Sequence, residues 1–391
     1  MSTYATAADM EYPASLVYGH FGLTMAVGWL ALAVRDRSQV LLALAMLLLG
    51  GTFLRSLGVP HPGLSMLVAD TLAKTIIIFT LHVTSLLALE RWALPSPKLP
   101  WRARLYAAYK ILWNSRWIGS RMQAPYTPTP RPSQVGRSRW AFVRGRLLHV
   151  VFLLFIDGVH SGVFHRLVGF HTEDYIEAHE TFFRRLPDVT GREASIRANA
   201  VLSVYFLSRP LTYVLLHDVL ACVFVGLGLD EPHEWPPLFG SISEAYTVRR
   251  YWSHFCDRLL YRPLTLWLKF LLRVLFGFGT PSRPWVGSRR HLLNFLTFLS
   301  SGLMHAWSLR LVGLTCGGRQ EVLFWCLNFA VIAGELLVER FVSPLRARVR
   351  SGQVPGALEK GIGYLWVFAF FFWASPKFQY VQMRCIPDHY N

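Results

Sequence analysis

A histidine inside an apolar stretch is the residue whose setting points most directly to chemistry. His305 lies in the stretch 294–307, and the small residues Ser300, Ser301 and Gly302 come just before it. Small residues let a second backbone or a ligand approach closely, and a neutral imidazole can accept a proton near physiological pH. The pattern fits a general base. A histidine that only packs between helices fits it equally well.

Other ionisable residues also lie inside apolar runs, where they are costly unless they face a polar interior. Histidines such as His82 and His217 are most often held by a backbone carbonyl of a neighbouring helix. Glu335, close to Arg340, can simply reach the membrane surface. So many polar groups indicate a polar chamber inside a helix bundle, which a channel or transporter would also have. The set comprises Asp70, Lys74, His82, Asp157, His160, His217, Asp218, His305 and Glu335.

The segments that would carry these residues are long enough to cross a membrane. A helix needs about 20 mostly apolar residues to cross a bilayer. Of the 391 residues, 53% are hydrophobic and only 16% are charged. We therefore predict an all-α integral membrane protein, a single membrane domain over 1–391 with about eight transmembrane helices enclosing a polar chamber. The expected spans are 14–34, 39–58, 70–89, 147–165, 207–229, 291–312, 321–339 and 360–376.

The stretch 263–280 differs from these spans, because Lys269 and Arg273 interrupt it. Together with Arg262 they fall at i, i+7 and i+11, within a narrow sector of one helical face. This spacing predicts an amphipathic helix that lies in the interface or re-enters the membrane. We place it in a cytoplasmic motif region over 230–290.

The distribution of basic residues predicts the orientation of the chain. The loop 91–145, which includes the Pro-rich segment 123–133, holds eleven Lys or Arg and no Asp or Glu, so we place it in the cytoplasm. The balanced loop 166–200 then lies in the lumen, and eight spans put both termini there. We expect a multi-pass protein of the endoplasmic reticulum. The net charge of +17 is spread between apolar runs, which favours contact with membrane lipid and argues against nucleic-acid binding.

The cysteines and the N-terminus carry weaker signals. The five cysteines show no paired spacing, so we expect neither a disulfide framework nor a zinc site. Asp9 and Glu11 precede the first apolar run, and the basic region typical of a signal peptide is missing. We expect the first apolar run to be retained as an anchor.

Three stretches, taken in order, resemble motifs of one enzyme family. Residues 114–120 are similar to an Asn-x-Arg-Gly-Ile-Gly signature, with Trp117 where glycine is usual. Residues 235–240 and 247–252 are similar to a Trp-x-Pro-Leu-Phe-Gly block followed by Ser-Leu-Arg-x-Phe-Trp. Residues 301–306 are similar to a histidine motif. The family is the wax synthase-like branch of the membrane-bound O-acyltransferases, and the style of the chain resembles its fungal terpenoid and meroterpenoid acetyltransferases.

The resemblance implies a set of site residues. His305 would be the general base. Asp257 stands where the family has His or Asn, and an ionised carboxylate could orient His305 but could not stabilise an oxyanion. His254 is an alternative partner for His305, and Asp257 could instead pair with nearby arginines at the membrane surface. The residues expected to bind the CoA co-substrate are Arg249, Arg250, Trp252, His254, Arg258 and Arg262, and no metal ligands are expected.

The resemblance also implies an activity. The family transfers an acyl group from acyl-CoA to an alcohol, so we expect an acyl-CoA-dependent O-acyltransferase with no permanently bound cofactor. The implied partners are acetyl-CoA and a lipophilic terpenoid or meroterpenoid alcohol from secondary metabolite biosynthesis. An alcohol is a weak nucleophile and the CoA thiolate a good leaving group, so a base and direct attack suffice. The alternatives are a wax-ester synthase acting on long-chain alcohols and a multi-spanning small-molecule transporter. The sequence does not predict the oligomeric state.

Overall fold

The structure of the chain is a computed structural model that describes residues 14–34, 36–58, 64–96, 98–120, 123–128, 136, 138–169, 171–349 and 356–386. Within these residues the regular elements are helices, and the β contact is an isolated bridge between Thr280 and Arg283. The predicted all-α class is therefore confirmed. Asp9, Glu11 and residues 129–133 of the Pro-rich segment lie outside the described residues.

Two compact units make up the chain. The first comprises Met1–Trp117, Leu259–Phe329 and Cys385–Asn391, and the second comprises Ile118–Arg258 and Ala330–Arg384. The long helix α11 (Gly318–Val349) therefore contributes its first residues to one unit and the rest to the other. The single membrane domain over 1–391, the cytoplasmic loop 91–145 and the motif region 230–290 stay predictions.

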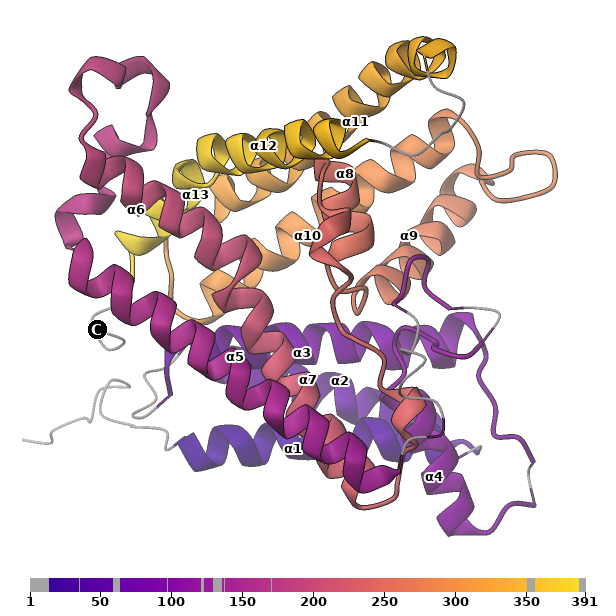
Figure 1. The fold of residues 1–391 in the computed structure, drawn as a ribbon. Coiled ribbons are helices and arrows are strands. Elements are labelled where there is room, and N and C mark those ends of the chain that lie inside the picture. Colours follow the sequence, from indigo (N-terminus) through magenta and orange to yellow (C-terminus); the bar gives the residue numbers. More distant parts are fainter. Residues whose placement is uncertain are drawn as a thin grey trace, which may run out of the picture. The chain divides into compact units, whose positions relative to one another are not determined.

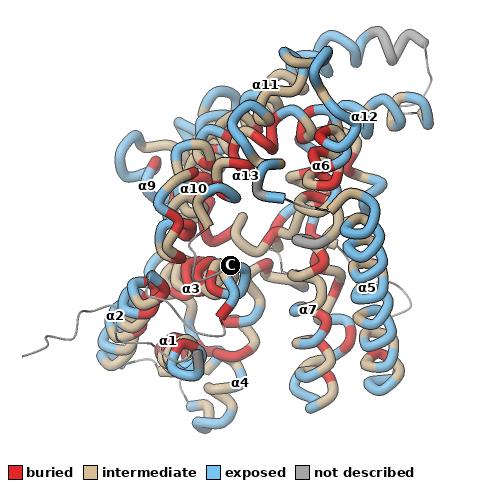
Figure 2. The backbone as a smooth tube through the Cα atoms, turned by 90° about the vertical axis from the view of Figure 1, so that its left-hand side faces the viewer, coloured by how far each residue is buried: buried red, intermediate tan, exposed pale blue. Residues whose placement is uncertain are grey.

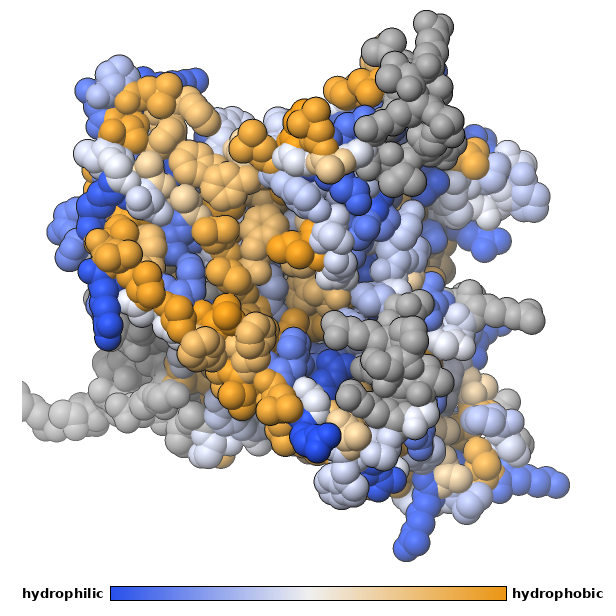
Figure 3. Space-filling view, in the orientation of Figure 1, coloured by the Kyte–Doolittle hydropathy of each residue, from blue (hydrophilic) through white to orange (hydrophobic). Residues whose placement is uncertain are grey.

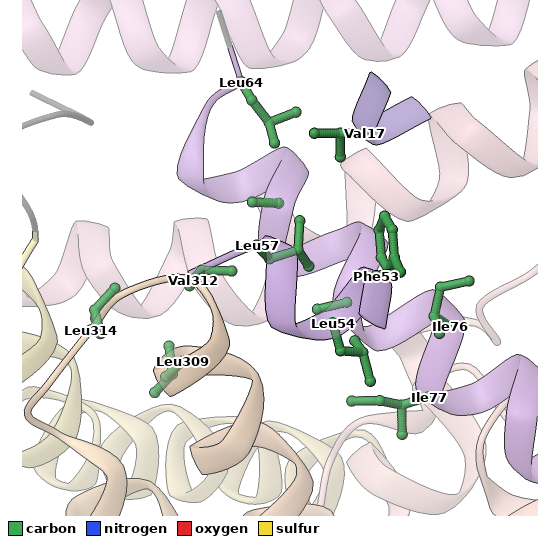
Figure 4. Close-up of a cluster of buried hydrophobic side chains, with 12 residues drawn as sticks. Val17, Phe53, Leu54, Leu57, Leu64, Ile76, Ile77, Leu309, Val312 and Leu314 are labelled. Atoms are coloured by element: carbon green, nitrogen blue, oxygen red, sulfur yellow. The ribbon is translucent and has the colours of Figure 1, made fainter. Parts of the chain in front are cut away.

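The first unit is built on three neighbouring helices, α1 (Ala14–Ala33), α2 (Ser38–Ser56) and α3 (Met66–Thr84), which lie side by side in Figure 1. It also contains α4 (Trp101–Leu112), α9 (Tyr261–Phe276) and α10 (Ser288–Leu311). Leu309 at the end of α10, and Val312 and Leu314 just after it, belong to a buried cluster with side chains of α2 and α3 (Figure 4). Burial of these apolar groups fixes the end of the helix that carries His305.

The second unit contains α5 (Arg139–Leu167), α6 (Gly191–Val201), α7 (Ser208–Gly226), α8 (Val248–Arg250), α12 (Ala357–Ala374) and α13 (Pro376–Met383). Helices α5 and α7 run side by side (Figures 1 and 2). Asp218 of α7 is fully buried and accepts hydrogen bonds from Arg146 and His149 of α5. Away from α7, hydrophobic side chains follow α5 as a diagonal band (Figure 3), as expected for a face in contact with lipid.

Within the described residues, seven helices are long and apolar enough to cross a membrane, and they coincide with seven of the eight predicted spans. The remaining predicted span, 291–312, forms α10, a 24-residue helix. Its length would suffice, but polar residues such as Asn294, Ser300 and His305 make it less apolar than the other seven. The chain is thus polytopic, as predicted, and the helix with the candidate base is its most polar long helix. The seven helices are Ser15–Ala33, Ser38–Ser56, Met66–Leu89, Arg139–Leu167, Gly191–Gly226, Gly318–Pro344 and Ala357–Ala374.

The interrupted stretch 263–280 forms α9, a separate 16-residue helix with a strongly one-sided distribution of apolar residues. Its buried side includes Leu264, Leu268 and Leu272, which follow one another at i, i+4 and i+8. The predicted amphipathic helix is therefore present. Its position in the membrane interface stays a prediction.

A disulfide joins Cys316 and Cys385, whose Cα atoms lie 6.1 Å apart. The expectation that the cysteines form no disulfide is therefore wrong for this pair. The two residues are 69 positions apart. Their pairing depends on how the chain folds back and leaves no trace in local spacing. Cys222, Cys256 and Cys326 are free thiols.

Candidate active site

His305 lies against two side chains of α11, Glu321 and Trp325. The imidazole Nδ1 is 3.8 Å from the Glu321 Oε1, and the Trp325 ring stacks on the imidazole with 4.8 Å between centroids. The Trp325 indole N–H donates to the same Glu321 oxygen at 3.1 Å. The three side chains form a closed triangle, which we call the His305 triad. Sequence reasoning missed Glu321 and Trp325, because they lie on the following helix and outside the three recognised motifs.

Gly302 lets α10 and α11 approach closely enough to form this triad. A Cβ at Gly302 would lie only 3.1 Å from the Cα of Val322 and 3.0 Å from the Cβ of Trp325. Distances this short mean that a larger residue would push the helices apart. The prediction that small residues before His305 permit close approach is confirmed, and what approaches is the backbone of α11.

Helix α3 anchors α10 one turn after His305. Asp70 accepts a hydrogen bond from the Ser308 hydroxyl at 2.7 Å and pairs with Lys74 at 2.6 Å. These polar residues are therefore engaged with each other inside the first unit. His82 behaves as predicted for a packing histidine, since its Nε2 lies 3.0 Å from the carbonyl oxygen of Ile111.

The motif segment 235–258 lies in the second unit and folds back on itself. The Gly240 N–H donates to the Phe255 carbonyl at 2.8 Å, and a Cβ at Gly240 would lie 1.9 Å from the His254 carbonyl oxygen. Only glycine fits there. This explains why the block that resembles Trp-x-Pro-Leu-Phe-Gly ends in glycine. At the start of the block, the Trp235 carbonyl accepts a hydrogen bond from Arg146.

Glu335 of α11 holds the start of α8 in the same unit. Its two carboxylate oxygens accept hydrogen bonds from the backbone N–H groups of Val248 at 2.7 Å and Arg249 at 2.8 Å. The Trp366 indole also donates to it, at 2.8 Å. The simple interpretation that Glu335 reaches the membrane surface is replaced by a capping role.

The four predicted CoA-binding arginines differ in their surroundings. The Arg249 side chain is exposed, whereas Arg250 pairs with Glu244 and lies over the Tyr246 ring. Arg258 is buried and donates to the Trp252 carbonyl at 3.3 Å. Of these three residues of the motif segment, Arg249 is best placed to meet a phosphate from solvent.

Arg262, the fourth of these arginines, belongs to the first unit. It is 8% exposed and forms an ion pair with Glu90 at 2.5 Å. Its guanidinium also stacks over the Trp117 ring, 4.3 Å from the centroid. Trp117 has a φ of +54°, a left-handed conformation that suits glycine, and glycine is what the resembled signature has there.

His254 is half-buried in the motif segment. Its Nδ1 lies 2.7 Å from the Ser253 hydroxyl, and its ring stacks on Tyr126 with 4.0 Å between centroids. Burial, together with the positive charges of Arg250, Arg249 and Arg258, lowers the pKa of His254 to about 4. The imidazole is therefore neutral at physiological pH.

Asp257 belongs to the second unit and His305 to the first. The structure thus gathers Arg249, Arg250, Trp252, His254, Asp257 and Arg258 in one segment, and assembles the His305 triad in the other unit. The predicted pairing of Asp257 or His254 with His305 stays a prediction.

Comparison with known proteins gives the chain its relatives. Residues 235–327 match the family described as membrane bound O-acyl transferase family. The chain is 27% identical over 300 residues to the acetyltransferase atnC of an Arthrinium species, a match that covers 74% of this chain and 65% of the relative. It is 31% identical over 156 residues to the acetyltransferase spyB of Aspergillus fumigatus, covering 37% and 25%. An acetyltransferase of Fusarium sporotrichioides is 27% identical over 304 residues, covering 73% and 66%.

The chain thus spans less than two thirds of the length of each of these relatives. No solved structure matches it. The family match begins at Trp235 and ends just after Trp325, so it contains both the motif segment and the His305 triad. Residues 235–327 of this chain thus match the membrane bound O-acyl transferase family, and the chain is similar to fungal acetyltransferases.

Proposed function

We propose that this protein is an acyl-CoA-dependent O-acyltransferase that uses His305 as its general base. The observation that carries the proposal is the His305 triad, because a buried carboxylate and an indole ring lie against the imidazole within the region that matches the family. A histidine that only packs between helices, as His82 does, would not need a buried carboxylate beside its ring.

The proposed reaction needs one base and no covalent intermediate on the enzyme. The acceptor hydroxyl gives its proton to the His305 Nε2 as its oxygen forms a bond to the thioester carbonyl carbon. The carbon–sulfur bond then breaks, CoA leaves as a thiolate, and the imidazolium returns its proton to that thiolate or to solvent. Base assistance of this kind contributes roughly 10²–10⁴-fold in rate.

The motif segment is the proposed place for the CoA phosphates. Arg249 is exposed, and its backbone is fixed by Glu335, so its guanidinium starts from a defined position. Arg250 and Arg258 would add positive charge beside Arg249, and the neutral His254 would offer a hydrogen bond. Arg262 is the weakest member of the predicted set, because its charge already pairs with Glu90.

The proposed substrates are an acetyl group from acetyl-CoA and a hydroxyl of a lipophilic terpenoid or meroterpenoid. Names of the relatives support the acetyl group, since they are acetyltransferases. The proposed membrane is the endoplasmic reticulum, with both termini in the lumen. The Cys316–Cys385 disulfide supports a lumenal position for its two segments, because disulfides persist in oxidising compartments.

The test compares membranes that carry wild type, His305→Ala or His291→Ala. His291 lies on the same helix and is exposed, so it is a matched control. Each preparation receives labelled acetyl-CoA or palmitoyl-CoA together with terpenoid alcohols or long-chain alcohols. We expect acetyl transfer to a terpenoid alcohol by wild type and by His291→Ala, and a loss of about 10²–10⁴-fold in His305→Ala.

Other outcomes point to the alternatives. Transfer of palmitoyl groups to long-chain alcohols would make the protein a wax-ester synthase. Full activity in His305→Ala would show that His305 is not the general base. Uptake of a terpenoid into sealed vesicles, without any product ester, would favour a transporter.

A further inference from the structure

Glu321 is a buried carboxylate that the reaction described above does not use. It is 6% exposed, and its Oε1 lies 3.8 Å from the His305 Nδ1. We propose that Glu321 is a positioning residue for His305, which keeps a proton on Nδ1 and stabilises the imidazolium formed during transfer. This inference rests on the proposed function, in which Nε2 is the basic atom.

The chemistry follows from the two nitrogens of the ring. A neutral imidazole carries one N–H and one lone pair, and the partner of one nitrogen decides which form is present. A carboxylate beside Nδ1 favours the form with the proton there, and this leaves the lone pair on Nε2 for the acceptor hydroxyl. At 3.8 Å the two atoms are beyond a direct hydrogen bond and within the distance of an ion pair once the imidazole is protonated. Catalytic hydrogen bonds are often long before substrate binds.

Trp325 fixes both members of the pair. Its indole N–H holds the Glu321 Oε1 at 3.1 Å, and its ring covers one face of His305 at an interplanar angle of 26°. Glu321 and Trp325 are four residues apart on α11, so both side chains lie on the same side of that helix. The carboxylate therefore has a defined direction, as a positioning group requires.

Other charged groups lie on the helices packed against α10. On α3, Asp70 and Lys74 pair with each other, and α9 carries Arg262, Lys269 and Arg273. None of these changes in the variants below. A change in the protonation of His305 between wild type and a Glu321 variant therefore reports the carboxylate.

The first test measures the pH dependence of acyl transfer by Glu321→Gln, which removes the charge and keeps the shape. We expect kcat to fall about tenfold or more, equal to about 1.4 kcal/mol or more of transition-state stabilisation, with little change in KM. The acid limb of the kcat/KM profile should move to lower pH, because protonation of His305 becomes less favourable without the nearby anion.

Two further variants control for simple loss of structure. Glu321→Asp keeps the charge, so the acid limb should stay at the wild-type position even if kcat falls. Trp325→Phe keeps an aromatic ring beside His305 but removes the indole N–H together with part of the ring, so it should lower kcat less than Glu321→Gln. Glu339→Gln, the same change at an exposed position of α11, is the matched control and should resemble wild type.

A second readout does not need acyl transfer. Diethyl pyrocarbonate reacts with neutral imidazole, and the His305 side chain is 20% exposed. The rate of His305 modification, followed by mass spectrometry from pH 5 to 8, gives the midpoint of its protonation. We expect this midpoint to move to lower pH in Glu321→Gln and to stay in place in Glu339→Gln.

The outcomes separate this inference from the proposed function. If wild type transfers acyl groups but Glu321→Gln keeps the wild-type kcat, acid limb and modification midpoint, Glu321 has no positioning role. A shifted acid limb in Asp257→Asn, with Glu321→Gln unchanged, would assign that role to Asp257. If wild type transfers nothing while the midpoint still moves in Glu321→Gln, the pair stands and the acyltransferase proposal fails.

Discussion

Glu335 accepts a hydrogen bond from the backbone N–H of Arg249 at 2.8 Å, although 86 residues separate the two in the sequence. The same carboxylate also accepts from Val248, so it fixes the first turn of α8. Glu335→Ala leaves these N–H groups without their acceptor, which costs about 1–3 kcal/mol for each buried group. We expect a lower melting temperature and a higher KM for acetyl-CoA, with kcat changed less. In Glu335→Gln one oxygen remains, so both effects should be smaller. An unchanged KM for acetyl-CoA in Glu335→Ala would mean that the position of α8 does not contribute to CoA binding.

Trp117 occupies a glycine-type conformation, with φ at +54°, beneath the guanidinium of Arg262. Trp117→Ala loses the stacking and keeps the strain, whereas Trp117→Gly loses the stacking and relieves the strain. We expect the glycine variant to be more stable than the alanine variant by roughly 1–2 kcal/mol. Urea or thermal unfolding in detergent measures the difference.

Trp113 provides the matched control for this comparison. Its φ is −85°, in the right-handed region, so the alanine variant should equal or exceed the glycine variant there. If the alanine and glycine variants rank in the same order of stability at both positions, the left-handed conformation of Trp117 has no energetic cost.

His254 makes folding stability depend on pH in a defined window. Its pKa is about 4 in the folded protein against 6.5 for an ordinary histidine, because burial and three arginines disfavour the charged form. Between pH 6.5 and 4, His254 is protonated in the unfolded chain but stays neutral in the folded protein. The free energy of unfolding therefore decreases as the pH falls through this window. We expect His254→Gln to lose less stability than wild type over this window, as measured by melting in detergent. His291→Gln, at an exposed histidine, should follow wild type. Parallel curves for all three proteins would contradict the prediction.

The Cys316–Cys385 disulfide joins the turn between α10 and α11 to the segment after α13. Cys316→Ser and Cys385→Ser should each lower stability by about 2–5 kcal/mol, and the double variant should lose no more than either single one. Cys222→Ser is the control at a free thiol. Mass-tagging of thiols with and without reductant checks the pairing. Labelling of both Cys316 and Cys385 without reductant in membranes would exclude the bond.

The sequence predicts much of the fold, because apolar length and composition decide where helices cross a membrane. It indicated seven of the apolar helices and the amphipathic helix α9, and it drew attention to His305 and Gly302. It missed Glu321, which precedes an apolar run and looks like an ordinary first-turn acid of α11. Its role becomes visible only when α10 and α11 pack.

The sequence also could not give the second partners of polar residues. Glu335, Arg262 and Asp70 each bind groups between 86 and 238 positions away, namely the backbone of Arg249, Glu90 and Ser308. No local pattern encodes such distances. The Cys316–Cys385 disulfide was not predicted for the same reason, since its two cysteines are 69 positions apart.

The disulfide also constrains how the chain is threaded through the bilayer. Two thiols can join only on the same side of a membrane, so the chain between Cys316 and Cys385 must cross it an even number of times. Two of the helices apolar enough to cross, Gly318–Pro344 and Ala357–Ala374, lie between these cysteines. Both of them cross, or neither does. Locating either cysteine relative to the membrane therefore locates the other, and a single accessibility measurement places both ends of the segment 316–385.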